Sequence, residues 1–178
     1  TKVYFSPRLS QERVRVAQSV KDGEHVLDMF AGVGPFSILI AKTRKVVVYA
    51  VDINTEAVGY LKRNIALNRV EGRVPPLLGD VREIVTRSLK RRVDRAIMNL
   101  PERAIEFVPT ACEALRPEGG IIHYYSFEKG IEAIDQAEEE LRRKVEEAGR
   151  EVVAEKASRL VREIAPRMWQ VVVDILVR

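Results

Sequence analysis

Apolar residues along the chain follow two patterns that alternate with each other. A continuous apolar run, typical of a strand buried on both faces of a parallel sheet, occupies residues 46–51, and further predicted strands occupy residues 25–29, 93–98 and 121–126. Segments with apolar residues every three or four positions, the spacing of an amphipathic helix, occupy residues 35–43, 54–68, 104–115 and 129–148. This alternation predicts a Rossmann-like α/β fold.

The remaining segments complete the predicted sheet. A strand at 74–78 contains Pro75 and Pro76, which places it at an edge, and two further strands at 151–162 and 169–177 should pair antiparallel. We therefore expect one domain over residues 1–178, with an N-terminal strand and helix at 1–24 and a core at 25–178. Its sheet should be seven-stranded and mostly parallel, with an antiparallel C-terminal strand and helices on both faces.

Composition narrows the class of protein. Of the 178 residues, 46% are hydrophobic and 31% charged, and the net charge of +4 is compatible with nucleic acid binding. The single Cys112 excludes an internal disulfide and a cysteine-built zinc site, and no other metal-ligand spacing occurs. Without a long apolar run or a signal peptide, we expect a cytoplasmic monomer with no membrane segment and no metal. The start at Thr1, inside an apparent strand, suggests a fragment whose upstream domains are missing.

The central motif is Asp28-Met-Phe-Ala-Gly-Val-Gly-Pro-Phe-Ser37, in which a strand enters a glycine turn and a helix follows. Gly32 and Gly34 allow the sharp turn and the close approach of a ligand, as in nucleotide-binding α/β folds. Ser37 occupies the third glycine position of a dinucleotide fingerprint, and Asp28 would repel a pyrophosphate there. The motif therefore favours a cationic methyl donor, S-adenosylmethionine, over a dinucleotide, although an ordinary Rossmann-like turn remains open.

Three further polar residues follow predicted strands. Asp52 lies 18 residues beyond Gly34, where Rossmann-like folds place a carboxylate on ribose hydroxyls, unless it is an ordinary exposed acid. Asp80 follows the third strand, where an adenine amino group would bind, but Gly79-Asp80 is also a common turn. Asn99 in Asn99-Leu-Pro101 offers a donor and an acceptor to the edge of a base, unless the tripeptide is only a turn before a helix.

Basic residues concentrate in residues 87–95. A charge run is usually a solvated face, but this run is also a candidate for contact with a phosphate backbone. Its cations are Arg87, Lys90, Arg91, Arg92 and Arg95.

Four segments give the chain a more specific resemblance. They are Tyr4-Phe-Ser-Pro-Arg-Leu-Ser-x-Glu-Arg13, the glycine motif, Asp52-Ile-Asn with Tyr60-Leu-x-x-Asn-Ile-x-Leu-Asn68, and Met98-Asn-Leu-Pro101 with Glu106-Phe107. Together they resemble the archaeal and eukaryotic tRNA (guanine-N1)-methyltransferases, class I enzymes that use S-adenosylmethionine to methylate guanosine 37. The glycine motif is common to many methyltransferases, whereas the Ser-Pro-Arg-Leu and Asn-Leu-Pro segments are more specific.

This resemblance implies residue roles. Glu12 would be the general base that removes the proton from N1 of guanine, and Asn99 and Pro101 would position the base. The methyl donor would be bound by Tyr4, Asp28, Phe30, Gly32, Gly34, Asp52, Ile53, Asp80 and Asn99. Contacts to the tRNA are expected from the charge of the residues rather than from the resemblance, at Arg8, Arg13, Arg87, Arg91 and Arg92.

Alternative functions share parts of this pattern. A wybutosine-pathway aminocarboxypropyltransferase uses the same scaffold and donor, but that branch lacks the Asn-Leu-Pro motif. A methyltransferase of exocyclic amines would have an aromatic residue where Glu102 stands. A nicotinamide-dependent oxidoreductase would not place Asp28 before the glycine turn, and a non-catalytic RNA-binding module would show no affinity for the donor.

Overall fold

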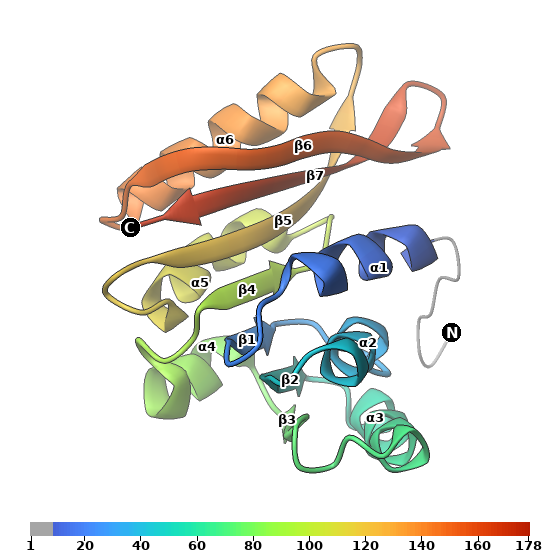
Figure 1. Cartoon of the computed structure of the whole chain (residues 1–178). Coiled ribbons are helices and arrows are strands. Elements are labelled where there is room, and N and C mark those ends of the chain that lie inside the picture. Colours follow the sequence, from blue (N-terminus) through green and yellow to red (C-terminus); the bar gives the residue numbers. More distant parts are fainter. Residues whose placement is uncertain (1–8) are drawn as a thin grey trace. The chain divides into compact units, whose positions relative to one another are not determined.

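The computed structural model describes residues 9–178, which fall into two compact units, residues up to Arg87 and residues Ser88–Arg178 (Figure 1). Tyr4 and Arg8, two of the residues expected to contact the donor or the tRNA, lie outside the described residues. A π-helix (Val85–Leu89) spans the junction between the units.

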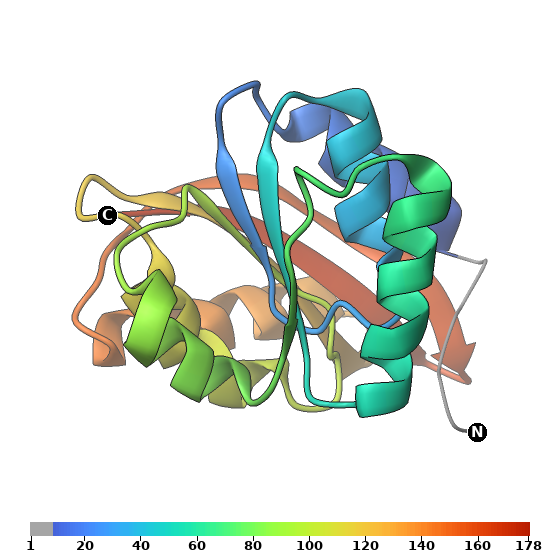
Figure 2. The ribbon, with the colours of Figure 1, turned by 90° about the horizontal axis from the view of Figure 1, so that it is seen from below.

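The first unit alternates helix and strand. Its elements are α1 (Ser10–Ser19), β1 (His25–Asp28), α2 (Pro35–Thr43), β2 (Val47–Asp52), α3 (Thr55–Asn68), β3 (Pro76–Leu78) and α4 (Val81–Ile84). The strands run parallel in the order β3-β2-β1, so the third strand is at an edge as expected. Helices α2 and α3 cover one face of these strands, and α4 lies on the other side (Figure 2).

The second unit contains the longer strands. Its elements are β4 (Arg95–Met98), a 3-10 helix (Ala104–Phe107), α5 (Val108–Ala114), β5 (Gly120–Lys129), α6 (Ala133–Glu147), β6 (Val152–Ala165) and β7 (Met168–Val177). The strand order is β4-β5-β7-β6, parallel between β4 and β5 and antiparallel in the other two pairs. Helix α6 packs on β5, β6 and β7. The described residues thus contain seven strands with antiparallel C-terminal pairing, which confirms the expected α/β class.

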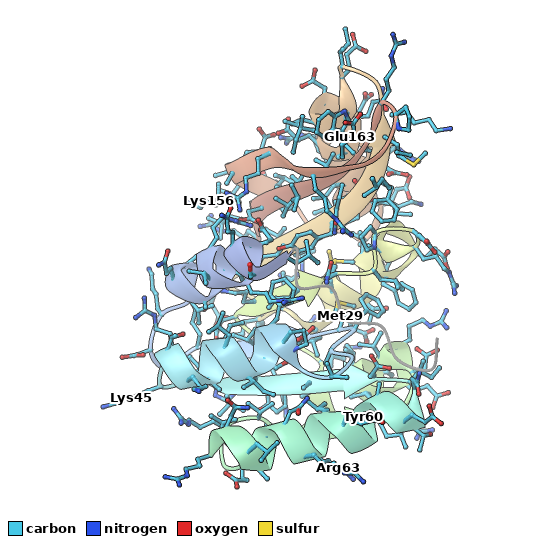
Figure 3. All side chains as sticks on the ribbon, turned by 90° about the vertical axis from the view of Figure 1, so that its right-hand side faces the viewer. Met29, Lys45, Tyr60, Arg63, Lys156 and Glu163 are labelled. Carbon is cyan, nitrogen blue, oxygen red and sulfur yellow. The ribbon has the colours of Figure 1, made fainter. Side chains whose placement is uncertain are left out.

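Strand β6 is an edge of the second unit's strands and is irregular along its length. Its pairing with β7 changes register four times, between Val152 and Ala154, Glu155 and Ala157, Leu160 and Arg162, and Glu163 and Ala165. Figure 3 labels Lys156 and Glu163, two charged side chains exposed on this strand.

Two helices of the first unit begin differently. Leu9 is the N-cap of α1, without a side-chain hydrogen bond, and Val14 on this helix faces solvent. Helix α3 is capped by Asn54, whose side chain accepts from the amides of Glu56 and Ala57. On α3 Tyr60 is exposed, and the Arg63 guanidinium lies over its ring, 5.8 Å from the centroid (Figure 3).

The glycine turn after β1 requires glycine at two positions. Gly32 and Gly34 have φ angles of 56° and 88°, a left-handed region that disfavours residues with a Cβ. A Cβ at Gly34 would lie 2.4 Å from Leu61 Cδ1 on α3, so α3 packs directly on the turn. This close packing fixes the start of α2, for which Gly34 is the N-cap.

We expect Gly34→Ala to lower the free energy of unfolding by about 1–3 kcal/mol, because the new Cβ requires a strained φ and displaces Leu61. Urea denaturation measures this change. The matched control is Gly59→Ala in the middle of α3, where a Cβ meets no atom within 4 Å and should stabilise the helix by up to about 1 kcal/mol. Equal effects of the two substitutions would contradict this account of the turn.

Candidate functional site

Asp28, at the end of β1, is a buried acid with an incomplete set of partners. Its side chain is 1% exposed, and the Ser37 hydroxyl donates to Oδ2 at 2.6 Å. The other oxygen, Oδ1, is buried and has no hydrogen-bond partner among the described residues. A buried carboxylate oxygen without a donor is costly, so the position fits a ligand that brings a donor or a positive charge.

The protonation of Asp28 reflects this environment. Burial raises its pKa to about 6, the Ser37 hydrogen bond lowers it, and the charge of Asp52 raises it further. The ammonium group of a methionine-derived donor would compensate the charge that burial disfavours.

Asp52, at the end of β2, holds the loops around the glycine turn. Its Oδ2 accepts from the Gly32 amide at 2.7 Å and its Oδ1 from the Asn54 amide at 2.8 Å. A carboxylate has about four acceptor positions, so these bonds leave room for ribose hydroxyls. Next to it Ile53 is 71% exposed, while Phe30 is half-buried. The residues expected to bind the donor's ribose therefore lie on a structured but open part of the first unit.

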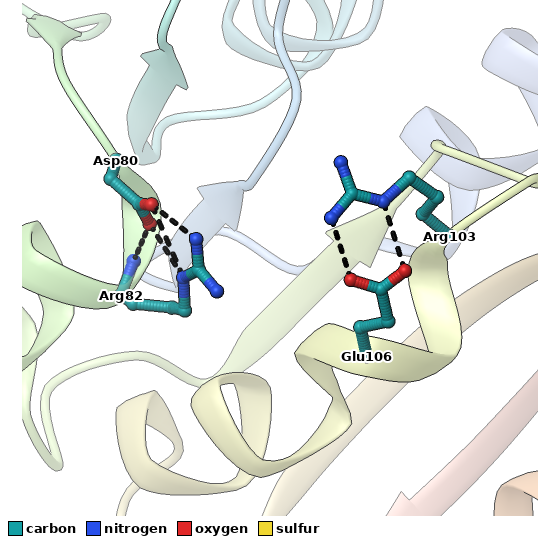
Figure 4. Close-up of polar contacts among 4 residues, drawn as sticks. All are labelled: Asp80, Arg82, Arg103 and Glu106. Atoms are coloured by element: carbon teal, nitrogen blue, oxygen red, sulfur yellow. Dashed lines mark hydrogen bonds and ion pairs between the residues drawn. The ribbon is translucent and has the colours of Figure 1, made fainter.

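Asp80 has local partners instead. Its carboxylate caps α4 by accepting from the Arg82 amide at 2.9 Å, and it forms an ion pair with the Arg82 guanidinium at 2.5 Å (Figure 4). Hydrogen bonds from the Arg82 side chain lower the pKa of Asp80. These contacts agree with the alternative interpretation of Gly79-Asp80 in the sequence, namely that it forms a turn.

The helix α1 carries two buried charged residues of the Ser-Pro-Arg-Leu segment. Glu12 is 2% exposed, and Arg15 Nε donates to its Oε1 at 2.8 Å. Glu12 thus has a cationic partner on its own helix, one turn away. Arg13 is also buried, with its guanidinium carbon 6.0 Å from the centre of the Phe36 ring, so it is less accessible to RNA than an exposed arginine.

In the second unit, Asn99 follows β4. It is half-buried, and its Oδ1 is buried without a partner among the described residues. The Leu100 carbonyl accepts from the amides of Arg103 and Ala104, so the chain turns directly from Asn99-Leu-Pro101 into the 3-10 helix. The exposed Arg103 and Glu106 form a two-bond ion pair on that helix (Figure 4). Asn99 thus offers an unused acceptor at a constrained position.

The basic stretch does not form one continuous surface. Arg87, Arg91 and Arg92 are exposed, whereas Arg95 is 1% exposed on β4 and is not part of a phosphate-facing patch. Arg95 Nη1 lies 2.8 Å from His123 Nε2. His123 Nδ1 is 2.6 Å from an Asp174 oxygen on β7. This buried network was not predicted from the sequence, because its members lie on three separate strands; it agrees with a core position for His123.

Within residues 9–178 no cluster of His, Cys, Asp and Glu could hold a metal ion. The helices of the same part of the chain include none that is long and apolar enough to cross a membrane.

Comparison with known proteins defines the class to which this site belongs. Residues 1–153 match the family described as the TRM5/TYW2 methyltransferase domain. The chain belongs to this family, which confirms the resemblance seen in its motifs and excludes the nicotinamide-dependent oxidoreductase.

The chain is also similar in sequence and structure to individual members of this family. The chain is 45% identical to tRNA (guanine(37)-N(1))-methyltransferase Trm5b of Pyrococcus abyssi over 99% of this chain and 51% of that protein. The crystal structure of that protein has a TM-score of 0.87 at 43% identity, over 99% of this chain and 51% of that one. A structure of Methanocaldococcus jannaschii TYW2 in complex with AdoMet has a TM-score of 0.91 at 34% identity, over 99% and 78%. The chain spans about half the length of Trm5b.

Replacement of the buried Asp28 by asparagine should stabilise the protein at neutral pH. The folded pKa of Asp28, about 6, lies above its ordinary value of 3.8, so its ionisation disfavours folding. Stability is therefore lost as pH rises from about 4 to 6, and the penalty at pH 7 is about 3 kcal/mol. Asp28→Asn should unfold at higher urea concentration than the wild type at pH 7, and this difference should shrink towards pH 4.

The exposed Asp135→Asn provides the control for simple loss of a carboxylate. A difference between Asp28→Asn and the wild type that does not change with pH would show that the buried carboxylate carries no such penalty.

Proposed function

We propose that this chain transfers a methyl group from S-adenosylmethionine to N1 of guanosine 37 in tRNA. The observation that carries the proposal is the buried Asp28 carboxylate beside the glycine turn, with Oδ1 left without a donor. It is supported by family membership, by 45% identity to a protein named for this reaction, and by the AdoMet complex of a related protein.

The donor would be held mainly by residues of the first unit. Asp28 would bind its ammonium group and Asp52 its ribose hydroxyls, while Phe30, Ile53 and Asp80 would contact the remainder. Gly32 and Gly34 allow the left-handed φ angles of the turn along which the donor would bind. S-adenosylmethionine supplies a methyl group on a positively charged sulfur, which is transferred to a nucleophile in line with the breaking bond. Tyr4 would join this set.

Glu12 would act as the general base. N1 of guanine carries a proton at neutral pH, so the nitrogen lone pair becomes available only when that proton leaves. As N1 forms its bond to the methyl carbon and the sulfur–carbon bond breaks, the proton would pass to the Glu12 carboxylate. The ion pair with Arg15 would orient this carboxylate before the reaction. Negative charge developing on the guanine oxygen would be stabilised by a cation, for which Arg8 and Arg13 are candidates.

Asn99 and Pro101 would position the guanine. The Asn99 amide can both donate and accept, and its free Oδ1 would be satisfied by a donor on the base edge. Pro101 limits the backbone conformations of this loop. The target base must leave the stack of the anticodon loop to reach such a site. We further propose that the chain acts in the cytoplasm as a monomer, with the exposed Arg87, Arg91 and Arg92 near the tRNA backbone.

One rival reaction is favoured by specific observations. The chain is 35% identical over 99% of its length to an aminocarboxypropyltransferase of Pyrococcus horikoshii that acts at position 37. The TYW2 structure also gives a TM-score of 0.91, slightly above the 0.87 of Trm5b. This rival reaction would transfer the aminocarboxypropyl group, a different substituent on the same sulfur atom of S-adenosylmethionine. Identity is higher to Trm5b, and Asn99-Leu-Pro101 favours methyl transfer.

Separate labelling of the donor distinguishes the two reactions. We expect S-adenosylmethionine labelled in its methyl group, incubated with this chain and a tRNA transcript containing guanosine 37, to give labelled N1-methylguanosine by mass spectrometry. Donor labelled in its carboxyl group should leave the tRNA unlabelled. Carboxyl label in the tRNA would support the aminocarboxypropyl rival instead, and bound donor without either label would contradict activity of this chain alone.

The general base is tested by Glu12→Gln, which keeps the size of the side chain but cannot accept the proton. We expect the single-turnover rate of methyl transfer to fall by about 10²–10⁴-fold with little change in the dissociation constant of S-adenosylmethionine. Arg15→Gln serves as the control for loss of the ion pair and should reduce the rate less. A Glu12→Gln rate close to that of the wild type would exclude this residue as the base.

A further inference from the structure

The second unit contains a pocket that is separate from the residues proposed to bind the donor and the guanine. Its volume is about 560 Å³, and all the residues that line it belong to residues 90–178. The pocket lies where the segments entering β4, β5 and β6 meet the end of β7. Its lining includes Lys90, Arg91, Cys112, Glu113, Arg150 and Arg178.

The charges of this pocket are unevenly balanced. Four cationic side chains line it, against one acidic side chain, Glu113, which pairs with Lys90 at 3.0 Å. The Arg150 guanidinium donates to four backbone carbonyls, among them those of Cys112 and Leu115, and so forms part of the wall. Carbonyl partners do not neutralise its charge. The pocket therefore has an excess of positive charge.

Arg91 is a cation of this pocket that is available to a ligand. It is exposed, and its side chain has no hydrogen-bond or ion-pair partner within residues 9–178. The Glu113 carboxylate of the pocket pairs with Lys90 instead. An unpaired guanidinium beside a pocket can donate two parallel hydrogen bonds to a phosphate.

The backbone of Arg91 is also unusual. Its φ of 57° is uncommon for a residue with a side chain, and its amide donates to the Glu113 carbonyl at 2.9 Å. The residue follows the π-helix Val85–Leu89, another uncommon conformation that is frequent at functional sites. Strained backbone is retained where the surroundings enforce it, often at ligand sites. The backbone conformation of Arg91 thus places an unpaired guanidinium at the pocket.

We propose that this pocket binds a phosphate group of the RNA backbone through Arg91. Phosphate matches both the excess of positive charge and the donor geometry of arginine. The volume of the pocket, about 560 Å³, suits a nucleotide-sized group rather than a lone anion. The proposal rests on the proposed function, since a tRNA substrate supplies the phosphodiester.

The test replaces Arg91 by asparagine, which tolerates the left-handed backbone. We measure the dissociation constant of the tRNA transcript at several salt concentrations by filter binding. Arg91→Asn should weaken tRNA binding by about 3–10-fold and reduce the slope of log K against log salt by about one, as loss of one phosphate contact requires. The dissociation constant of S-adenosylmethionine should not change.

The matched control is Arg69→Asn. Arg69 is also exposed and has the same φ of 57°, but it caps α3 in the first unit and does not line the pocket. This variant should keep the wild-type salt slope. Equal losses in both variants would show a non-specific effect of net charge and overturn the proposal, as would a wild-type slope in Arg91→Asn.

Titration with inorganic phosphate and with AMP distinguishes the source of the phosphate. Binding of either that is lost in Arg91→Asn, together with unchanged tRNA affinity, would overturn RNA as the ligand. If the wild-type chain methylates guanosine 37 while Arg91→Asn has an unchanged KM for tRNA, the pocket proposal fails and the proposed function stands. If the wild-type chain has no salt-dependent affinity for tRNA, both fail.

Discussion

The Asp52 carboxylate joins the two loops on which the first unit's candidate site depends. One oxygen accepts from the Gly32 amide in the turn after β1, and the other accepts from the Asn54 amide in the turn after β2. Hydrogen bonds to a charged acceptor contribute about 1.5–3 kcal/mol each. The glycine turn is therefore held by a side chain from the neighbouring strand, and the charge that does this also raises the pKa of Asp28.

Three acids implied by the family resemblance occupy three different environments. Asp28 is buried with one oxygen unsatisfied, Glu12 is buried against Arg15, and Asp80 is half-buried, caps α4 and pairs with Arg82. Such differences allow similar side chains to perform different tasks. Under the proposed function, a carboxylate that binds a cationic ligand, one that accepts a proton and one that shapes a turn would need no difference in residue type.

The sequence predicts those features that depend on neighbours along the chain. The alternation of strand and helix, the glycine turn and the Asn54 cap all arise from local pattern and were found. The buried position of Arg95 was missed because it depends on His123 and Asp174, which are distant in sequence. Periodicity likewise could not show that Tyr60 faces solvent, because its burial would require a partner element.

In the candidate site, the sequence predicts the residue types but not whether each side chain is buried or which groups it contacts. The sequence indicated carboxylates at residues 12, 28, 52 and 80, and the structure adds which of them are buried and what they bind. Arg15 as the partner of Glu12 could have been suspected from the three-residue spacing on a helix. The unsatisfied oxygens of Asp28 and Asn99 could not, since they follow from packing.

The irregular course of β6 has a consequence for the behaviour of the protein in concentrated solution. A long, flat outer strand offers unpaired amides and carbonyls to a second molecule, which can extend the sheet into an aggregate. The four register shifts bend β6 and increase its twist, so a straight strand from another molecule cannot follow it. Charged side chains such as Lys156 and Glu163 add a desolvation cost to such pairing. The bulges thus protect the outer strand against intermolecular β-sheet growth.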